Sequence, residues 1–293
     1  MKFTGTTYRP PVEAMLGTEL LQVTVGCAHG ACGFCTMYGD KFKVEKLSQI
    51  ERDLKELRQY NSNIRRIFLV NGDAFVLSTN KLLAISDLII EHIPEVEVIT
   101  MYASISNVKS KSDEDLQKIR DMRINDLWMG LETGLDESLK YINKGHTLSE
   151  AIAQIERLNN AGIRHCDAYM LGVAGSGKGL ENAEATAKFI NHAGGTLIWF
   201  GTLGLFEGSP MSQAAKSGEF IPATEREIIE EEIRVLELLT VENVPFYGIH
   251  PTNTSSVQGL LSRDKEKMIN KLKIYLDSED PDFLDTAMRR DTL

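Results

Sequence analysis

Short apolar, β-branched runs alternate with helix-compatible stretches along most of this chain, and that alternation limits what it can fold into. Six runs are predicted to be strands: 20–26, 65–72, 95–103, 126–133, 165–172 and 197–206. Nearly continuous apolar strands that alternate with helices indicate a parallel sheet whose outer face is covered by those helices. We therefore predict an α/β fold, a partial (βα)6 barrel of the TIM type, with the site at the carboxyl ends of the strands.

Helix signals and composition shifts divide the chain further. Two capping boxes mark helix starts and two glycines suit helix ends: Thr147 with Glu150, Thr224 with Glu227, Gly162 and Gly194. We expect a lead-in over residues 1–17, the barrel over 18–242, and a C-terminal loop and helical extension over 243–293.

Composition narrows the class of protein. With 293 residues, 42% of them hydrophobic and 25% charged, the chain has the composition of an ordinary globular protein. No apolar run reaches the roughly 18 residues of a membrane span, and the first residues lack the apolar core of a secretory signal. Four cysteines are too few for a disulfide scaffold, so we expect a cytoplasmic protein, and a monomer. The net charge of −10 argues against nucleic-acid binding.

Three of the four cysteines lie within nine positions, directly after the first predicted strand. Cys27, Cys32 and Cys35 form the pattern Cys-x4-Cys-x2-Cys, which favours a metal centre over unligated thiols. A zinc site with His29 as fourth ligand and a [2Fe–2S] cluster, which needs a fourth thiolate, are alternatives. Cys166 lies on a distant predicted strand and is interpreted as a small core residue. The remaining interpretation is a [4Fe–4S] cluster held by three thiolates, with one iron open to a small molecule.

The cysteine loop resembles that of the radical S-adenosylmethionine (SAM) superfamily. The usual spacing there is Cys-x3-Cys-x2-Cys with an aromatic residue before the last cysteine, here Phe34, and this loop has one residue more. The resemblance covers about residues 18–212, and segment 130–147 is similar to the fourth strand of oxygen-independent coproporphyrinogen oxidases and tRNA-modifying enzymes. It implies an enzyme that cleaves SAM reductively to methionine and a 5′-deoxyadenosyl radical, which abstracts hydrogen from a substrate. A flavodoxin- or ferredoxin-like electron donor is implied as well.

The same resemblance implies SAM contacts at successive strand ends. The candidates are Asn71, Gly72 and Asp73 for the methionine amino group, Ser104 for the ribose, Glu132 for the ribose or methionine part, Lys144 for the carboxylate, and Leu171 with Gly172 for the adenine. Taken singly, each of these residues is also compatible with a turn, a core position or a solvated surface position.

The substrate is not readable from the sequence, and no residue is assigned a catalytic role. Tyr247, His250 and Asn253 cluster in a polar stretch after the barrel and are candidate substrate contacts, with a surface loop as the alternative. The acidity of the chain favours a small-molecule substrate. A tRNA-modifying enzyme and a non-catalytic iron–sulfur or zinc-binding protein are the alternatives. A nucleotide hydrolase is disfavoured, because the P-loop-like segment 172–179 has Gly179 where the magnesium-binding Ser or Thr belongs.

Overall fold

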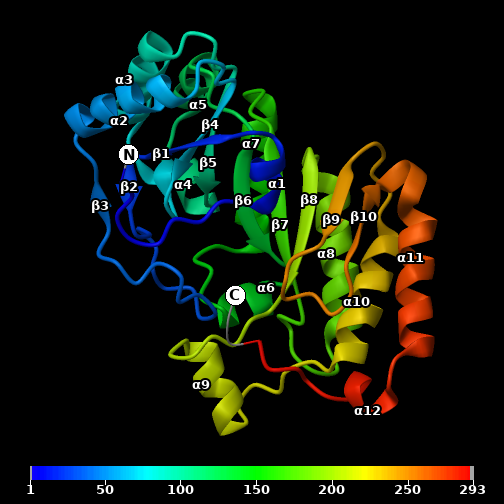
Figure 1. The fold of residues 1–293 in the computed structure, drawn as a ribbon. Helices are drawn as coiled ribbons and strands as arrows, with labels where there is room; N and C mark the ends of the chain where they lie inside the picture. The colour runs from blue at the N-terminus through cyan, green and yellow to red at the C-terminus, as the bar shows by residue number, and fades with distance from the viewer. Residues whose placement is uncertain (1, 291–293) are drawn as a thin grey trace. The chain divides into compact units, whose positions relative to one another are not determined.

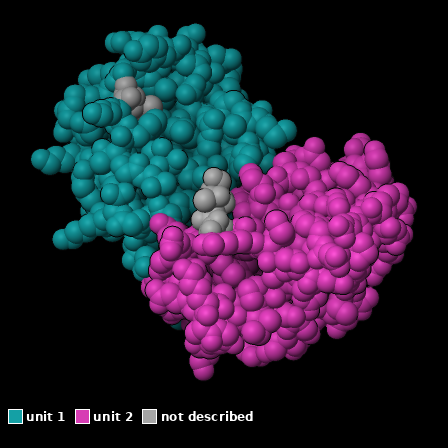
Figure 2. All heavy atoms as spheres, turned by 60° about the horizontal axis from the view of Figure 1, so that its bottom comes forward, with its two compact units in different colours: residues 1–30, 37–130, 154–165 teal, residues 31–36, 131–153, 166–293 magenta. Residues whose placement is uncertain are grey.

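A computed structural model describes residues 2–290 of the chain. The chain is divided into two compact units, which Figure 2 shows in two colours. Unit 1 comprises residues 1–30, 37–130 and 154–165, and unit 2 comprises residues 31–36, 131–153 and 166–293. The mostly parallel sheet has eight strands, to which both units contribute. This architecture confirms the predicted α/β class.

Unit 1 contains four parallel strands and a small antiparallel pair. The parallel strands follow the order β1 (Glu19–Gln22), β4 (Arg66–Val70), β5 (Val98–Ala103) and β6 (Leu127–Glu132), and β6 runs on into unit 2. The antiparallel pair is β2 (Thr24–Val25) with β3 (Lys43–Val44), on either side of the cysteine loop. Leu21, Leu69 and Met101 lie opposite one another in successive strands and are fully buried, so the ladder is also a hydrophobic core.

The helices of unit 1 are short to medium in length. They are α1 (Pro11–Met15), α2 (Leu47–Tyr60), the 3-10 turn η1 (Ala74–Val76), α3 (Thr79–His92), α4 (Ile105–Lys109), α5 (Asp113–Asp121) and the second half of α7 (Leu148–Asn160). Helices α2, α3 and α5 pack side by side (Figure 1). In α2 the buried residues Ile50, Leu54 and Leu57 recur every three or four positions, which gives the helix one apolar face.

The lead-in packs into the interior of unit 1 through Glu13, which is fully buried. Its carboxylate accepts hydrogen bonds from Arg66 Nε (2.7 Å) and Nη2 (2.6 Å) and from Trp128 Nε1 (2.7 Å). Thr18 Oγ1 donates a fourth at 2.7 Å, and Arg66 also pairs with Asp126 at 2.5 Å. Burial alone would lower the pKa of Arg66, but the two carboxylates outweigh it and raise that pKa. Glu13 therefore anchors the lead-in to the interior of unit 1, while Met15 and Leu16 beside it are exposed.

Unit 2 contains the other four strands. They follow the order β7 (His165–Leu171), β8 (Leu197–Thr202), β9 (Pro245–Gly248) and β10 (Val257–Leu260). The first three are parallel, and β10 is antiparallel to β9.

The helices of unit 2 are the first half of α7, α6 (Asp136–Tyr141), α8 (Gly179–Ala193), α9 (Pro210–Ser217), α10 (Glu225–Leu238), α11 (Leu261–Ser278) and α12 (Pro281–Leu284). Helices α8, α10 and α11 stand side by side (Figure 1). Both predicted capping boxes are formed, at the starts of α7 and α10, and Gly194 ends α8 with a φ of 72°. Over residues 2–290, no helix is long and apolar enough to cross a membrane.

The six predicted strands are confirmed, with two differences. The first run breaks at Val23, so that β1 pairs with β4 while β2 pairs with β3. The sheet also gains β9 and β10 within residues 243–293, where the sequence predicted a loop and helices. Each of these strands has four residues, and each contains a glycine, so neither run is long enough to give a recognisable strand pattern.

Candidate functional site

The second half of the cysteine loop, residues 31–36, belongs to unit 2 and is fixed there by its backbone. Gly33 N donates to Ile142 O at 2.7 Å, and Met211 N donates to Gly33 O at 3.0 Å. Asn143 Nδ2 donates to Ala31 O at 3.0 Å. A Cβ at Gly33 would lie 3.5 Å from the Ile142 backbone. The loop is thus pinned to the segment after α6 and to the start of α9.

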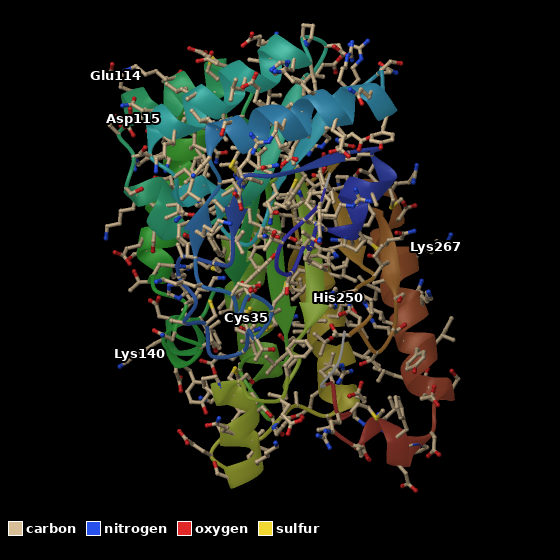
Figure 3. The ribbon with its side chains drawn as sticks, turned by 60° about the vertical axis from the view of Figure 1, so that its left-hand side comes forward. Cys35, Glu114, Asp115, Lys140, His250 and Lys267 are labelled. Carbon is tan, nitrogen blue, oxygen red and sulfur yellow. The ribbon has the colours of Figure 1, made fainter. Side chains whose placement is uncertain are left out.

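The three candidate ligands are divided between the two units along the chain, with Cys27 in unit 1 and Cys32 and Cys35 in unit 2. Cys32 is partly buried and Cys35 is exposed on the unit 2 half of the loop (Figure 3). Cys27 follows Gly26 in unit 1, where φ is +72° and a Cβ would lie 2.4 Å from Asp40 O. That position therefore requires glycine. Within residues 2–290, no set of three or more His, Cys, Asp and Glu side chains is gathered as a ready-made metal site.

The [2Fe–2S] and zinc alternatives each need a fourth ligand, and the two candidates for it are Cys166 and His29. Cys166 is buried and is the second residue of β7, at the amino end of that strand, with Sγ 4.0 Å from Thr196 Oγ1. Its place agrees with a core residue, because parallel strands present their sites at the carboxyl end. His29 is exposed on the unit 1 half of the loop.

A buried ion pair lies beside the unit 2 cysteines. Lys144 Nζ contacts Glu132 Oε1 at 2.5 Å, and the two side chains are only 12% and 10% exposed. The ammonium also lies 5.8 Å from the centre of the Phe34 ring. Burial alone would lower the pKa of Lys144, but Glu132 and the charges of Cys32 and Cys35 outweigh burial and raise it. A fixed cation next to two soft sulfur donors fits an anionic, thiolate-held iron–sulfur centre.

Two residues of this segment are unusual, Glu132 in its backbone conformation and His146 in the burial of its ring. Glu132, the last residue of β6, has a φ of 64°, a conformation uncommon outside glycine and frequent at functional sites. His146 is 9% exposed, and among residues 2–290 neither of its buried ring nitrogens has a hydrogen-bond partner. Burial and the nearby Lys144 cation lower the pKa of His146 to about 4, so its ring is neutral at pH 7. Apart from its place beside Lys144, nothing in the sequence pattern distinguishes His146 from the other histidines.

The ends of β6 and β7 are joined by a buried chain of polar side chains. Thr133 Oγ1 donates to Asn182 Oδ1 at 2.5 Å, and Asn182 Nδ2 donates to Glu231 Oε1 at 2.6 Å. Glu231 Oε2 accepts from Gly172 N at 2.9 Å, and Leu171 is fully buried. Burial raises the pKa of Glu231 to about 8. The adenine role of Leu171 and Gly172 stays a prediction, and the N–H of Gly172 already serves Glu231.

In unit 1, the segment after β4 is buried and closely packed. Asn71 is fully buried and its Nδ2 donates to Thr24 O at 3.1 Å. At Gly72 a Cβ would lie 2.6 Å from the Tyr38 ring, so the close approach of Tyr38 needs glycine there. Asp73 is 4% exposed. The Asn71 amide therefore ties this segment to β2, and the assignment of all three residues to SAM stays a prediction.

Ser104 directly follows β5, and Lys111, which the sequence motifs do not point to, follows α4. Ser104 caps α4, because its hydroxyl accepts from Asn107 N at 3.3 Å and Asn107 Oδ1 accepts from Ser104 N at 3.0 Å. Lys111 is buried and donates to Phe75 O at 2.7 Å. Burial lowers the pKa of Lys111 to about 8, and the nearby Asp73 offsets part of this effect. Ser104 thus has a structural use, and its ribose role stays a prediction.

The three candidate substrate residues lie at and after β9 in unit 2. Tyr247 is on the strand and His250 follows it (Figure 3). Asn253 Nδ2 donates to Phe200 O at 3.0 Å, and Asn253 Oδ1 accepts from Thr202 Oγ1 at 3.1 Å. The Asn253 amide thus holds its loop to the end of β8.

A strap formed by residues 285–290 holds the same loop. Arg290 pairs with Glu225 through Nη1 (2.8 Å) and Nη2 (2.5 Å), and Glu225 is fully buried. The same guanidinium donates to Thr252 O at 2.5 Å and to Thr254 Oγ1 at 2.9 Å. Thr252 Oγ1 in turn lies 2.5 Å from His250 Nδ1. The strap therefore sets the position of the loop that carries His250.

The P-loop-like segment has its donors occupied by a carboxylate. Glu227 Oε1 accepts from Gly177 N at 2.6 Å and from the Ser176 hydroxyl at 3.0 Å. Lys178 Nζ pairs with Glu137 at 2.8 Å on the surface. A glutamate thus lies where a phosphate would have to bind, which argues against nucleotide hydrolysis.

Comparison with known proteins places the chain in a family. The model of the radical SAM superfamily matches residues 21–190, more than half of the chain. The chain belongs to the radical SAM superfamily, which confirms the resemblance seen in its motifs. It is also similar to a curated protein, the heme chaperone HemW of Lactococcus lactis subsp. lactis (strain IL1403), with 27% identity over 140 residues. That match covers 46% of this chain and 37% of HemW, so the chain spans little more than a third of that relative.

Solved structures share the fold at low sequence identity. Coproporphyrinogen III oxidase (HemN) from Escherichia coli has a TM-score of 0.56 at 15% identity, covering 79% of this chain and 59% of HemN. The archaeal Elp3 of Methanocaldococcus infernus has a TM-score of 0.54 at 15% identity, covering 91% and 69%. TsrM from Kitasatospora setae, solved with cobalamin and a [4Fe–4S] cluster, has a TM-score of 0.52 at 15% identity, covering 68% and 37%. Family and neighbours together support a [4Fe–4S] cluster and SAM as cofactors.

Proposed function

We propose that this chain is a radical SAM enzyme, an oxidoreductase or transferase, that acts as a monomer on a small-molecule substrate. Cys27, Cys32 and Cys35 hold the [4Fe–4S] cluster, and a flavodoxin- or ferredoxin-like protein supplies electrons. A reduced cluster held by these three thiolates would supply the electron for cleavage of SAM to methionine and a 5′-deoxyadenosyl radical, which would abstract hydrogen from the substrate. The observation that carries the proposal is the buried Lys144–Glu132 pair, whose ammonium lies 5.8 Å from the centre of the Phe34 ring, next to Cys35 in the chain.

The chain's own residues bind and orient SAM in this proposal. The Lys144 ammonium has three N–H donors, of which Glu132 accepts one, so two remain for the carboxylate of SAM. Glu132 fixes the direction of the ammonium, because a lysine alone is a flexible point charge. Asn71, Gly72 and Asp73 receive the amino group from the end of β4.

Replacement of Lys144 by alanine is expected to weaken SAM binding. The lost contact is charge-assisted and shielded, worth roughly 1.5–3 kcal/mol, which corresponds to a Kd raised about 10- to 100-fold. Calorimetry on cluster-containing protein measures it. The matched control is Lys140→Ala, since Lys140 points outward from α6 (Figure 3) and is expected to leave the Kd unchanged. An unaltered Kd in a folded Lys144→Ala protein would remove this lysine from the SAM site.

The reaction itself is tested by chromatography of the products. Anaerobically reconstituted protein with SAM and dithionite is expected to release 5′-deoxyadenosine and methionine slowly, even without substrate. A fully loaded, SAM-binding protein that gives no 5′-deoxyadenosine with any reductant would be a non-catalytic iron–sulfur protein. Methylthioadenosine as the product would indicate cleavage of another sulfur–carbon bond and a different reaction class.

Two comparisons favour other substrates of the same chemistry. The similarity of segment 130–147 to tRNA-modifying enzymes makes tRNA the second candidate, and filter binding of bulk tRNA tests it. The similarity to a heme chaperone makes a tetrapyrrole a third, and an absorbance titration with heme tests that.

A further inference from the structure

The two faces of the unit 2 strands differ in their burial. Tyr169, Leu171, Ile198, Phe200 and Phe246 are buried on one face. Tyr169 stands edge-on to Phe189 of α8 at 6.2 Å, so this face meets the helices. On the other face Ala168, Met170, Trp199, Gly201 and Tyr247 are partly exposed. Parallel strands in α/β proteins normally have both faces covered, so a partly exposed face is an unusual feature that needs an explanation.

The strand register places large and small side chains of this face next to each other. Ala168 lies opposite Trp199, and Trp199 lies opposite Tyr247, in one row across β7, β8 and β9. In the next row Met170 lies opposite Gly201. Directly opposed side chains on one face of a sheet are in contact range. Trp199 and Tyr247 therefore stand beside two positions, Ala168 and Gly201, that have almost no side chain.

His250 completes this face from the loop after β9. Its ring stands edge-on to Trp199, with centroids 5.1 Å apart and an interplanar angle of 80°, and a Cβ at Gly201 would lie 3.5 Å from it. Nδ1 is engaged by Thr252, which the strap residue Arg290 holds, and within residues 2–290 Nε2 has no hydrogen-bond partner, so Nε2 is the ring nitrogen that would bind a ligand. Burial lowers the pKa of His250, which keeps the ring neutral at pH 7.

We propose that these six residues, the aromatic face, bind a planar uncharged ring of the substrate: Ala168, Met170, Trp199, Gly201, Tyr247 and His250. Aromatic rings attract other rings in stacked or edge-on geometry, and the Met170 thioether makes favourable contacts with ring edges. Ala168 adds only a methyl group to this face beside Trp199, and none of the six residues is an aspartate, a glutamate, a lysine or an arginine. His250 Nε2 adds one hydrogen bond that sets the orientation. That the ring belongs to the substrate rests on the proposed function; the binding of the ring does not.

A matched pair of small alcohols tests the aromatic face: planar 2-naphthol and its saturated counterpart trans-2-decalol. Binding to reconstituted protein with SAM is followed by saturation-transfer NMR and calorimetry, without reductant. We expect the Kd of 2-naphthol to be at least tenfold lower than that of trans-2-decalol. Equal affinities for the two alcohols would overturn the proposal, because they would indicate unspecific apolar binding.

Variants locate the binding. Ala168→Leu, which places a larger side chain opposite Trp199, and Trp199→Leu, which removes a ring, are each expected to raise the Kd of 2-naphthol at least fivefold. Thermal melting shows which of the two is folded, and one folded variant is enough. The control is Tyr141→Leu, an exposed aromatic residue on α6 that lies outside the face, which should leave the Kd unchanged. Unchanged affinity in the folded Ala168→Leu and Trp199→Leu variants, or a loss of affinity in Tyr141→Leu, would place the ring elsewhere.

The test separates this inference from the proposed function. Selective 2-naphthol binding by a protein that never releases 5′-deoxyadenosine would support the aromatic face and contradict radical SAM chemistry. Release of 5′-deoxyadenosine without naphthol selectivity would support the chemistry and contradict the aromatic face.

Discussion

Protein in which Cys27, Cys32 or Cys35 is replaced by alanine is expected to hold no [4Fe–4S] cluster and to release no 5′-deoxyadenosine. Reconstituted wild-type protein should bind about four irons and four sulfides per chain. Because a cubane held by three thiolates has no fourth cysteine to fall back on, loss of one ligand leaves two irons without a protein ligand. Iron and sulfide assays, with the visible absorbance of the cluster, measure the loss.

Two control variants distinguish ligation by three thiolates from ligation that includes Cys166 or His29. Cys166→Ala is expected to keep its cluster, because Cys166 is buried at the amino end of β7; loss of the cluster in this variant would contradict the open iron. His29→Ala should likewise leave the iron content unchanged. Bound zinc instead of iron, released by His29→Ala, would establish the zinc alternative.

The second large effect is on stability. Glu13→Ala is expected to reduce the free energy of unfolding by about 3–5 kcal/mol, because it leaves the Arg66 guanidinium buried without one of its two carboxylates. It also removes the acceptor of Trp128 Nε1 and of the Thr18 hydroxyl. Urea unfolding followed by tryptophan fluorescence measures the change, since Trp128 reports directly on this network.

The matched control is Glu97→Ala, which removes a glutamate from an exposed pair with Arg65. Exposed ion pairs contribute little, so the urea midpoint should hardly move. The double variant Glu13→Leu with Arg66→Met should recover part of the loss, because it removes both buried charges and not one. A Glu13→Ala midpoint equal to that of Glu97→Ala would mean that the buried network contributes no stability.

Local patterns in the sequence predicted the strands and the loop but not the side-chain network behind them. The run 165–172 was recognisable because apolar residues follow one another, and Cys-x4-Cys-x2-Cys because its spacing is short. Glu231 was invisible, since it meets the Gly172 N–H from 59 positions away. In the sequence, its carboxylate cannot be distinguished from the other charged side chains of the amphipathic helix α10.

The candidate site shows the same limit residue by residue. Glu132 and Lys144 are predicted together from segment 130–147, each as a contact with SAM, and the structure pairs the two side chains with each other. Asn253 was selected for its polarity, and its amide is used by β8. Whether a polar side chain faces a ligand or the chain's own backbone depends on long-range packing, which spacing does not encode.

The long reach of Glu13 has a consequence for the order in which the chain folds. Its partner Trp128 lies 115 residues later, so this contact closes one of the longest loops in unit 1. Loop closure over such a distance costs entropy before any contact compensates it, which slows contacts of this kind. During synthesis, residues 2–17 leave the ribosome long before β6 exists. The hydrogen bond from Trp128 to Glu13 can therefore form only after β6 has been made, whereas the pair of Glu13 with Arg66, 53 residues apart, does not have to wait for it.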